Sequence, residues 1–181
     1  MICNIGNWGE KMSSKLFKII TGGDEGVGKT TLLHRYVEGR FIADTKATLG
    51  VEFFWKVFNT KGKQLDLQLW DFAGQKLFRH ILKNYATGAS GALLLFDLTS
   101  KSSLGQINDW VDIFRDKDPN LPIIFLGTKL DLTDLIEVED NDAIFFKEKY
   151  NFLDYIKVSS KTDENVNLAF QLLVNEILIR M

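Results

Sequence analysis

The sequence has 181 residues, a length typical of a single domain that buries its own hydrophobic core. Its formal net charge of −2, with acidic and basic residues interspersed, excludes a broad electrostatic attraction to nucleic acid or anionic lipid. The one cysteine, Cys3, excludes an internal disulfide and suits a cytoplasmic location, and no apolar run reaches the roughly 18 residues of a transmembrane helix. We expect residues 1–14 to be a short N-terminal extension and residues 15–181 to form one domain.

Short apolar runs predict six β-strands, over residues 15–20, 50–58, 65–72, 91–98, 121–128 and 152–160. The second and third flank "NTKGK", a turn of hairpin length, and the fourth and fifth are almost continuously apolar, as strands buried on both faces are. Amphipathic stretches over residues 28–38, 75–86, 103–117, 139–149 and 164–180 predict helices. The alternation predicts a three-layer α/β fold: a mostly parallel six-stranded sheet with one antiparallel edge strand and helices on both faces.

The first predicted strand runs into "TGGDEGVGKTT", residues 21–31, where Gly23 is followed after four residues by Gly28, Lys29 and Thr30. A glycine-rich turn between a strand and a helix directs successive backbone N–H groups at one spot, where they bind phosphate. We expect Lys29 to reach the β- and γ-phosphates of a nucleotide and the Thr30 hydroxyl to bind Mg²⁺. The loop predicts a nucleoside triphosphate site and leaves the base and the reaction open. Its expected binding residues are Gly23, Glu25, Gly26, Val27, Gly28, Lys29, Thr30 and Thr31.

A second motif follows the third predicted strand, where "LQLWDFAGQ" places Asp71 at the strand tip. We expect its carboxylate to hold Mg²⁺, directly or through a water, opposite Thr30. Gly74 lets its backbone amide approach a γ-phosphate closely, and Gln75 can orient a water for in-line attack. An Asp-x-x-Gly sequence alone is more often a turn, and the preceding phosphate loop makes it a candidate site here.

The segments "GDEGVGKTTLLHRY", "TLGVEF", "LQLWDFAGQKLFR" and "VSSKTDENVNLAF" resemble the Ras superfamily of small GTPases, and most of all its Rab branch. The resemblance extends from about Lys15 to Ile179 and implies a P-loop G domain that binds GTP or GDP with Mg²⁺. It implies that Thr48 coordinates Mg²⁺ and contacts the γ-phosphate. It also implies that Phe41 packs against guanine, whereas the residue by itself would be interpreted as a core aromatic at a helix end.

The resemblance also implies how the base is recognised. The family's base-reading segment is matched by residues 128–131, with Thr128, Lys129 and Asp131 as the expected contacts. The Asp131 carboxylate would accept from the N1–H and 2-amino groups of guanine, which adenine does not offer. The segment that backs the base is matched by Ser159, Ser160 and Lys161.

The sequence departs from the family pattern at several positions. Thr128 replaces the commoner asparagine, Ser160 an alanine, and Lys76 the glutamate of the Rab branch. Thr45 stands where Ras-type proteins often carry a tyrosine that folds over the nucleotide. The chain stops at Met181 without the C-terminal cysteines that receive prenyl groups in this branch, so we expect either a truncated tail or a protein without the usual membrane anchor.

The implied function is a molecular switch that hydrolyses GTP to GDP and phosphate, with a role in membrane traffic. No arginine lies within residues 41–48, so we expect slow turnover that a GTPase-activating protein would accelerate about 10³–10⁵-fold by supplying one. Exchange factors and effectors are the other implied partners, and peripheral membrane association would come through partners. The expected catalytic residues are Gln75, Lys29, Thr48 and Gly74.

Phe53, Trp70 and Tyr85 fall where Rab proteins display three exposed aromatic side chains to effectors. The same residues fit a core between strand and helix equally well, because aromatic side chains are favoured both in interfaces and in cores. The sequence leaves these two interpretations open.

Glu25 lies inside what should be a pocket for anions. Facing inward at ~5 Å from one phosphate charge, it would cost about 3 kcal/mol at an effective dielectric constant of about 20. We therefore expect its side chain to face solvent or to meet a cation such as Lys76, and we expect it to slow or alter activated hydrolysis.

Two other functions remain open at this point. A GTP-locked interaction protein with little hydrolysis is favoured by Glu25 and opposed by the presence of Gln75. A P-loop kinase or ATPase of another class is opposed by residues 128–131 and by the absence of an arginine-rich lid segment.

Overall fold

The computed structural model describes residues 15–60 and 62–181, so Cys3 and the expected N-terminal extension lie outside the described residues. Six strands form one sheet in the order β2-β3-β1-β4-β5-β6. Among the described strands, β2 alone is antiparallel; it pairs with β3 at the sheet edge, which confirms the predicted mixed sheet and hairpin. The strands are β1 Lys15–Gly23, β2 Val51–Thr60, β3 Lys63–Phe72, β4 Gly91–Asp97, β5 Ile123–Thr128 and β6 Asp154–Lys157.

Five α-helices begin close to the predicted positions, but two of them start as 3₁₀ helices. In the stretch predicted as one helix over residues 103–117, Gly105 and Ser103 weaken α-helix formation, because glycine has low propensity and the Ser103 hydroxyl donates to the Ser100 carbonyl at 2.7 Å. The helices are α1 Lys29–Glu38, η1 Lys76–Phe78, α2 Arg79–Ala86, η2 Lys101–Gln106, α3 Ile107–Phe114, η3 Thr133–Leu135, α4 Asp140–Tyr150 and α5 Val166–Ile179.

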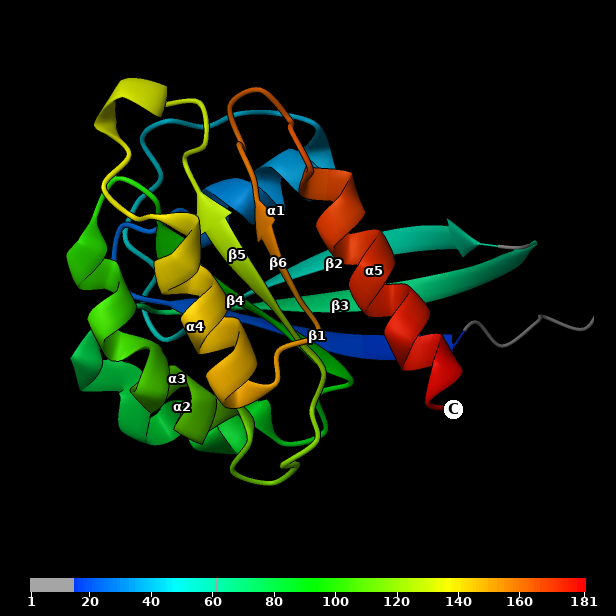
Figure 1. Ribbon diagram of the computed structural model, residues 1–181. Coiled ribbons are helices and arrows are strands. Elements are labelled where there is room, and N and C mark those ends of the chain that lie inside the picture. The colour runs from blue at the N-terminus through cyan, green and yellow to red at the C-terminus, as the bar shows by residue number, and fades with distance from the viewer. Residues whose placement is uncertain (1–14, 61) are drawn as a thin grey trace, which may run out of the picture.

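The helices cover both faces of the sheet (Figure 1): α1 and α5 pack on one face, and α2, α3 and α4 on the other. On the first face Tyr36 of α1 stacks on Phe170 of α5, with ring centroids 3.5 Å apart. On the second, Trp110 and Phe114 of α3 lie buried against the strands. β4 and β5 are buried along their whole length, as their continuous apolar runs predicted. The β2–β3 hairpin extends beyond the helices.

The strand register brings the carboxyl ends of four neighbouring strands to one edge of the sheet. Thr21 of β1 pairs with Asp71 of β3, and Asp97 of β4 pairs with Thr128 of β5. Because ligands of such sheets bind beyond the carboxyl ends of the strands, this edge is where a site is expected.

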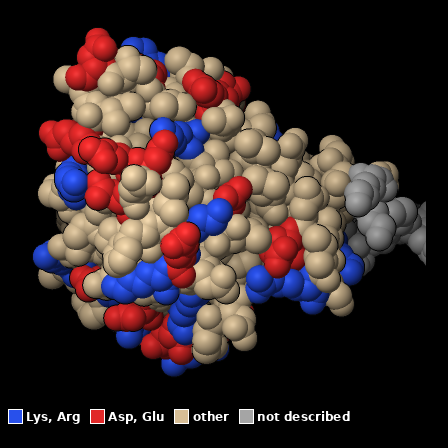
Figure 2. Space-filling view, in the orientation of Figure 1, with Lys and Arg blue, Asp and Glu red and all other residues tan. Residues whose placement is uncertain are grey.

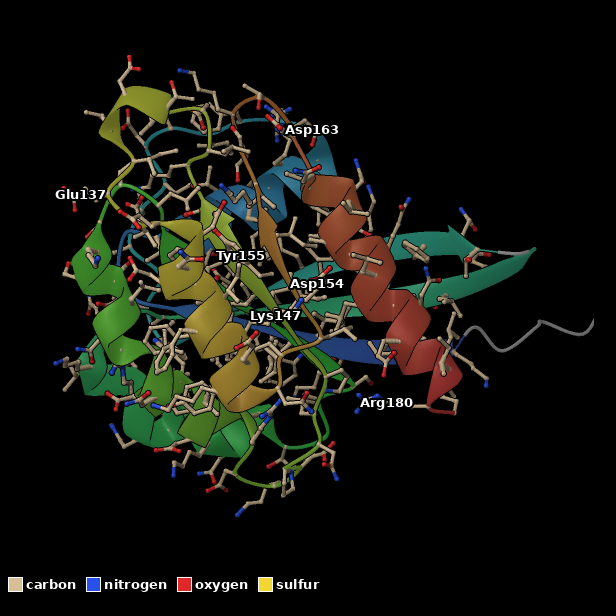
Figure 3. The ribbon with its side chains drawn as sticks, viewed as in Figure 1. Glu137, Lys147, Asp154, Tyr155, Asp163 and Arg180 are labelled. Carbon is tan, nitrogen blue, oxygen red and sulfur yellow. The ribbon has the colours of Figure 1, made fainter. Side chains whose placement is uncertain are left out.

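Charged side chains of both signs are interspersed over the face shown in Figure 2. Several form partly buried pairs, such as Lys147 Nζ with Asp154 Oδ1 at 2.7 Å, labelled in Figure 3. Within residues 15–60 and 62–181, no helix combines the length and apolar character that crossing a membrane requires.

The contact between α1 and α5 predicts the cost of removing an aromatic ring. Phe170→Ala should lower the free energy of unfolding by about 3–5 kcal/mol, because it leaves a cavity beneath Tyr36. The measurement is denaturant unfolding followed by circular dichroism. Leu168→Ala, on the exposed side of the same helix, is the control and should change stability by about 0.5 kcal/mol or less. Equal losses in the two variants would contradict the prediction.

Candidate functional site

The glycine loop between β1 and α1 encloses a buried lysine. Lys29 is 6% exposed, and its Nζ donates to the carbonyl oxygens of Gly23 at 3.0 Å and Asp24 at 2.8 Å. Burial lowers the pKa of Lys29 from 10.5 to about 8, although the carboxylates of Asp71, Asp24 and Glu25 act in the opposite direction. The loop therefore surrounds a buried ammonium group, to which no carboxylate of residues 15–60 and 62–181 is bonded directly.

The three residues expected at a metal ion lie together. Thr30 Oγ1 donates to Asp71 Oδ2 at 2.5 Å, Thr48 Oγ1 donates to the same oxygen at 3.1 Å, and the two hydroxyls are 3.0 Å apart. Burial raises the pKa of Asp71, with the Thr30 hydrogen bond and the Lys29 charge partly offsetting it.

One carboxylate oxygen of Asp71 indicates whether Thr30, Thr48 and Asp71 together fit a cation. Asp71 is fully buried, and among the described residues its Oδ1 has no hydrogen-bond partner. An unsatisfied buried carboxylate oxygen is costly unless a cation or an ordered water completes it. Two hydroxyls and a carboxylate are the oxygen ligands that Mg²⁺ accepts beside waters and phosphates, so these residues fit Mg²⁺.

A cavity of about 210 Å³ brings the expected catalytic residues together. Lys29 and Thr48 line it, and so do Gly74 and Gln75 from the loop after β3. Gly74 must be glycine here, because a Cβ would lie 2.5 Å from the backbone nitrogen of Glu25. The backbone after β3 thus rests directly on the glycine loop. Lys46 also lines this cavity, and the sequence analysis did not identify it.

Glu25 also lines this cavity. Its side chain is exposed, and Oε1 accepts a hydrogen bond from Nε2 of Gln75 at 3.0 Å. The hydrogen-bond partner of the exposed Glu25 carboxylate is therefore the neutral amide of Gln75. It is not the Lys76 cation that the sequence analysis suggested. Gln75, the residue expected to orient water, therefore donates a hydrogen bond to Glu25, the acid expected to slow or alter activated hydrolysis.

A second cavity, of about 540 Å³, adjoins the first and contains most of the expected base-binding residues. Phe41 lines its wall and is 41% exposed, which excludes the alternative of a core aromatic. Ser159, fully buried, donates from Oγ to Asp131 Oδ1 at 2.6 Å and so orients that carboxylate. The cavity is lined by Gly26, Val27, Gly28, Thr31, Phe41, Ala43, Thr45, Thr128, Lys129, Asp131, Leu132, Ser160 and Lys161.

Thr128 joins three segments of this cavity. Its buried hydroxyl bonds to the carbonyl oxygens of Val27, in the glycine loop, at 2.7 Å and of Phe96, in β4, at 2.9 Å. The threonine that replaces the family's asparagine therefore connects the phosphate loop to the base-reading segment.

Two arginines that support the site escaped the sequence analysis. Arg79 of α2 contacts Asp24 Oδ1 at 3.2 Å and Asp109 Oδ2 at 2.5 Å, which ties the glycine loop to α2 and α3. Arg35 of α1 donates from Nε to the Ser160 carbonyl at 2.6 Å and so fixes the segment that backs the base cavity. A helix-borne arginine carries no distinctive sequence signal, so neither contact could have been predicted.

The three aromatic residues considered as an effector surface contact one another. Phe53 and Trp70 meet edge to face with centroids 4.6 Å apart, and Tyr85 lies 6.0 Å from Trp70. Phe53 is 56% and Tyr85 40% exposed, so these two are not core residues, whereas Trp70 is partly buried. Lys18 Nζ lies 3.6 Å from the centroid of the Trp70 ring.

A glycine loop with a buried lysine, a hydroxyl-and-carboxylate cluster beside it and an adjoining base-sized cavity define a P-loop nucleotide-binding protein. The family model described as "Ras family" matches residues 18–179 of the chain. The chain is 39% identical over 163 residues to Ras-related protein Rab-11A of Dictyostelium discoideum, covering 90% of this chain and 76% of that protein. It is 40% identical over 156 residues to Ras-related protein Rab-4B of Rattus norvegicus, covering 86% and 73% respectively. The chain belongs to the Ras family of small GTPases and, within it, to the Rab branch: it is a small GTP-binding switch protein.

The contacts of Thr128 generate a stability prediction. Thr128→Val keeps the shape but removes the donor to two buried carbonyls, so the free energy of unfolding should fall by about 1–3 kcal/mol. Denaturant unfolding at a fixed GDP concentration measures it. Thr133→Val, at an exposed threonine, is the control and should stay within about 0.5 kcal/mol of wild type. An unchanged stability in Thr128→Val would contradict the bridging role.

Proposed function

We propose that the protein hydrolyses GTP to GDP and phosphate with Mg²⁺ as cofactor and that its loops signal which nucleotide is bound. The observation that carries this proposal is one cavity lined by Lys29, Thr30, Thr48 and Gln75. The two threonine hydroxyls in turn donate to the carboxylate of Asp71. Hydrolysis of a phosphoanhydride needs a cation for the phosphates, a metal site and a group that orients water. The Lys29 cation, the two hydroxyls of the metal cluster and Gln75 all line this one cavity.

In the proposed reaction the residues of the site bind the phosphates, orient the attacking water or sense the γ-phosphate. The glycine-loop amides and the Lys29 ammonium bind the β- and γ-phosphates, and Gln75 orients the attacking water. Mg²⁺, when bound, would neutralise charge on the phosphate oxygens. Thr48 and Gly74 would contact the γ-phosphate of bound GTP. Loss of this phosphate on hydrolysis would therefore release the two loops that contain these residues.

Guanine selectivity is proposed to come from Asp131. Ser159 fixes this carboxylate at the base cavity, where it can accept from two N–H groups of guanine. Lys129 and Phe41 supply walls of the same cavity. An adenine in this position would leave the carboxylate unpaired, which favours GTP over ATP.

The proposed partners are effectors, exchange factors and GTPase-activating proteins. Two of the three clustered aromatic residues are exposed, and exposed aromatics are frequent anchors of protein interfaces, which supports an effector surface at Phe53, Trp70 and Tyr85. The relation to the Rab branch supports a role in membrane traffic, at a cytoplasmic location with peripheral membrane association through partners.

Multiple-turnover phosphate release with GTP and with ATP, with and without Mg²⁺, tests the proposed function. We expect slow release with GTP and Mg²⁺ and none above background with ATP. Equal turnover of ATP would overturn the assignment, and tight GTP binding without release would support the GTP-locked alternative.

The Glu25–Gln75 hydrogen bond predicts faster hydrolysis when it is removed. Glu25→Ser should raise the rate of GTP hydrolysis in a single turnover about 2- to 10-fold, because it frees the Gln75 amide to orient water, while GTP affinity should change about twofold or less. Rapid-quench measurement of GTP-loaded protein gives the rate.

Two comparisons make this result specific. Glu148→Ser, which removes an exposed glutamate from α4, should leave the rate unchanged. Glu25→Ser combined with Gln75→Leu should show no acceleration, because the gain depends on the amide. A Glu25→Ser rate equal to wild type would disprove the restraint on Gln75.

A further inference from the structure

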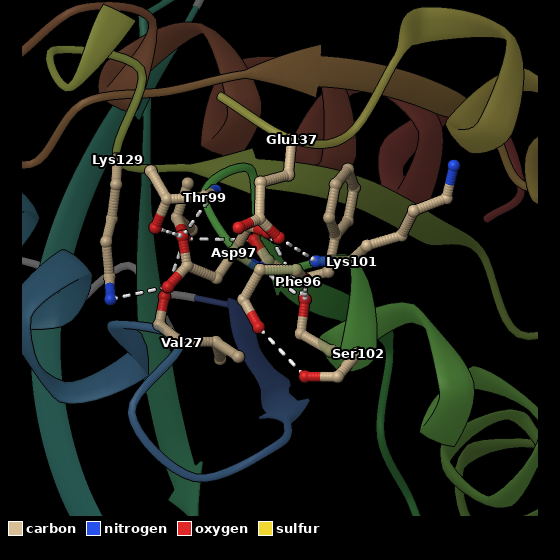
Figure 4. A network of polar contacts seen from close by, with 11 residues as sticks. Val27, Phe96, Asp97, Thr99, Lys101, Ser102, Lys129 and Glu137 are labelled. Atoms are coloured by element: carbon tan, nitrogen blue, oxygen red, sulfur yellow. Dashed lines mark hydrogen bonds and ion pairs between the residues drawn. The ribbon is translucent and has the colours of Figure 1, made fainter. Parts of the chain in front are cut away.

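Lys129 of the base cavity is held by a carboxylate outside the base-reading segment. Its Nζ lies 2.6 Å from Oδ2 of Asp97, the last residue of β4 (Figure 4). The Lys129 backbone has a φ of 63°, a left-handed conformation that is uncommon for a residue with a side chain. Asp97 pairs in register with Thr128, the residue that precedes Lys129. Neighbouring strands therefore bring the acid and the lysine together at the same edge of the sheet.

The second oxygen of Asp97 is already engaged. Oδ1 accepts from the Thr99 backbone nitrogen at 2.8 Å and from the Thr99 hydroxyl at 2.7 Å. The Asp97 backbone N–H donates to the Ser103 hydroxyl at 3.0 Å, so the main chain is fixed as well. Asp97 is 7% exposed, and a buried carboxylate is costly without a paired cation. The ammonium of Lys129 supplies that cation.

We propose that Asp97 is a positioning residue for guanine nucleotide binding: it anchors the Lys129 ammonium so that the side-chain stem of Lys129 forms a fixed wall of the base cavity. The inference rests on the proposed function and names a residue that prepares its base site. The Lys129 side chain is 37% exposed, and an unpaired lysine at that exposure would populate several rotamers. The pair removes this freedom before nucleotide arrives, so less entropy is lost on binding.

A purely structural role for Asp97 makes a different prediction. Asp97 also holds the turn that contains Thr99, and Asp97→Asn affects both contacts, because an amide has a single acceptor oxygen. Thr99→Val removes the hydroxyl contact and leaves the pair with Lys129 intact. The two variants therefore separate support of the turn from orientation of the lysine.

The experiment measures dissociation of fluorescently labelled GDP from the full chain in wild type, Asp97→Asn, Lys129→Met and the double variant. Asp97→Asn and Lys129→Met should each accelerate dissociation about 10- to 100-fold. The double variant should be no faster than Lys129→Met, because Asp97 acts through Lys129. Multiplied effects in the double variant would overturn the inference. Thermal unfolding reports whether each variant is folded.

Controls and failure cases are distinct. Thr99→Val and Asp154→Asn should dissociate GDP within about twofold of wild type; Asp154 forms the same kind of pair, with Lys147 at 2.7 Å, at the start of β6. If Asp97→Asn does not fold, the Lys129→Met variant alone tests the inference. GDP dissociation from Lys129→Met at the wild-type rate would overturn it. A wild-type chain that binds no GDP overturns the proposed function as well, whereas normal wild-type binding with an unchanged rate in Asp97→Asn overturns this inference alone.

Discussion

The burial of Lys29 is the constraint on which the proposed phosphate site depends. An ammonium removed from water loses its hydration, and this burial lowers the pKa of Lys29 to about 8 despite the nearby carboxylates. The carbonyls of Gly23 and Asp24 compensate for part of it and curl the loop around the lysine. An anion bound at the loop would stabilise the protonated form of Lys29 more strongly than the two neutral carbonyls that now accept its hydrogen bonds. Burying a lysine in this loop is thus costly by itself, and the same arrangement suits a phosphate.

This loop keeps its shape because backbone packs directly on backbone. A Cβ at Gly74 would lie 2.5 Å from the Glu25 nitrogen, and one at Gly23 would lie 2.3 Å from the carbonyl oxygen of Leu95. The segment after β3 can therefore approach the glycine loop, and the end of β1 can approach β4, only where side chains are missing. The sheet order makes this possible, because β1 lies between β3 and β4 and their carboxyl ends share one edge.

The sequence predicted the elements and residues whose signal is local. The continuous apolar runs of β4 and β5 and the glycines of the phosphate loop are short patterns, and the strands and helices were found close to their places. The division of two helices into 3₁₀ and α segments was missed, because it depends on contacts such as those of the Ser103 hydroxyl.

The contacts between distant segments were also missed. Arg79 reaches Asp24 across 55 residues, and Gln75 reaches Glu25 across 50, so no pattern in a short window could report either. Asp97 did carry a local signal, because it is an acid at the end of an otherwise apolar strand, and Asp71 likewise lies close to the end of β3. An acid near the end of a buried strand predicts a site residue at Asp97 as it does at Asp71.

The acids around this anion site follow one rule, and Glu25 is its exception. A carboxylate near bound phosphate raises the energy of the complex unless a cation or donor neutralises it. Each of the other acids is matched to a group other than the residue proposed to orient water. The Glu25 carboxylate is instead matched to Gln75, the residue proposed to orient water, so its neutralisation occupies the group that catalysis requires. The other matched pairs are Asp24 with Arg79, Asp97 with Lys129, Asp131 with Ser159, and Asp71 with Thr30 and Thr48.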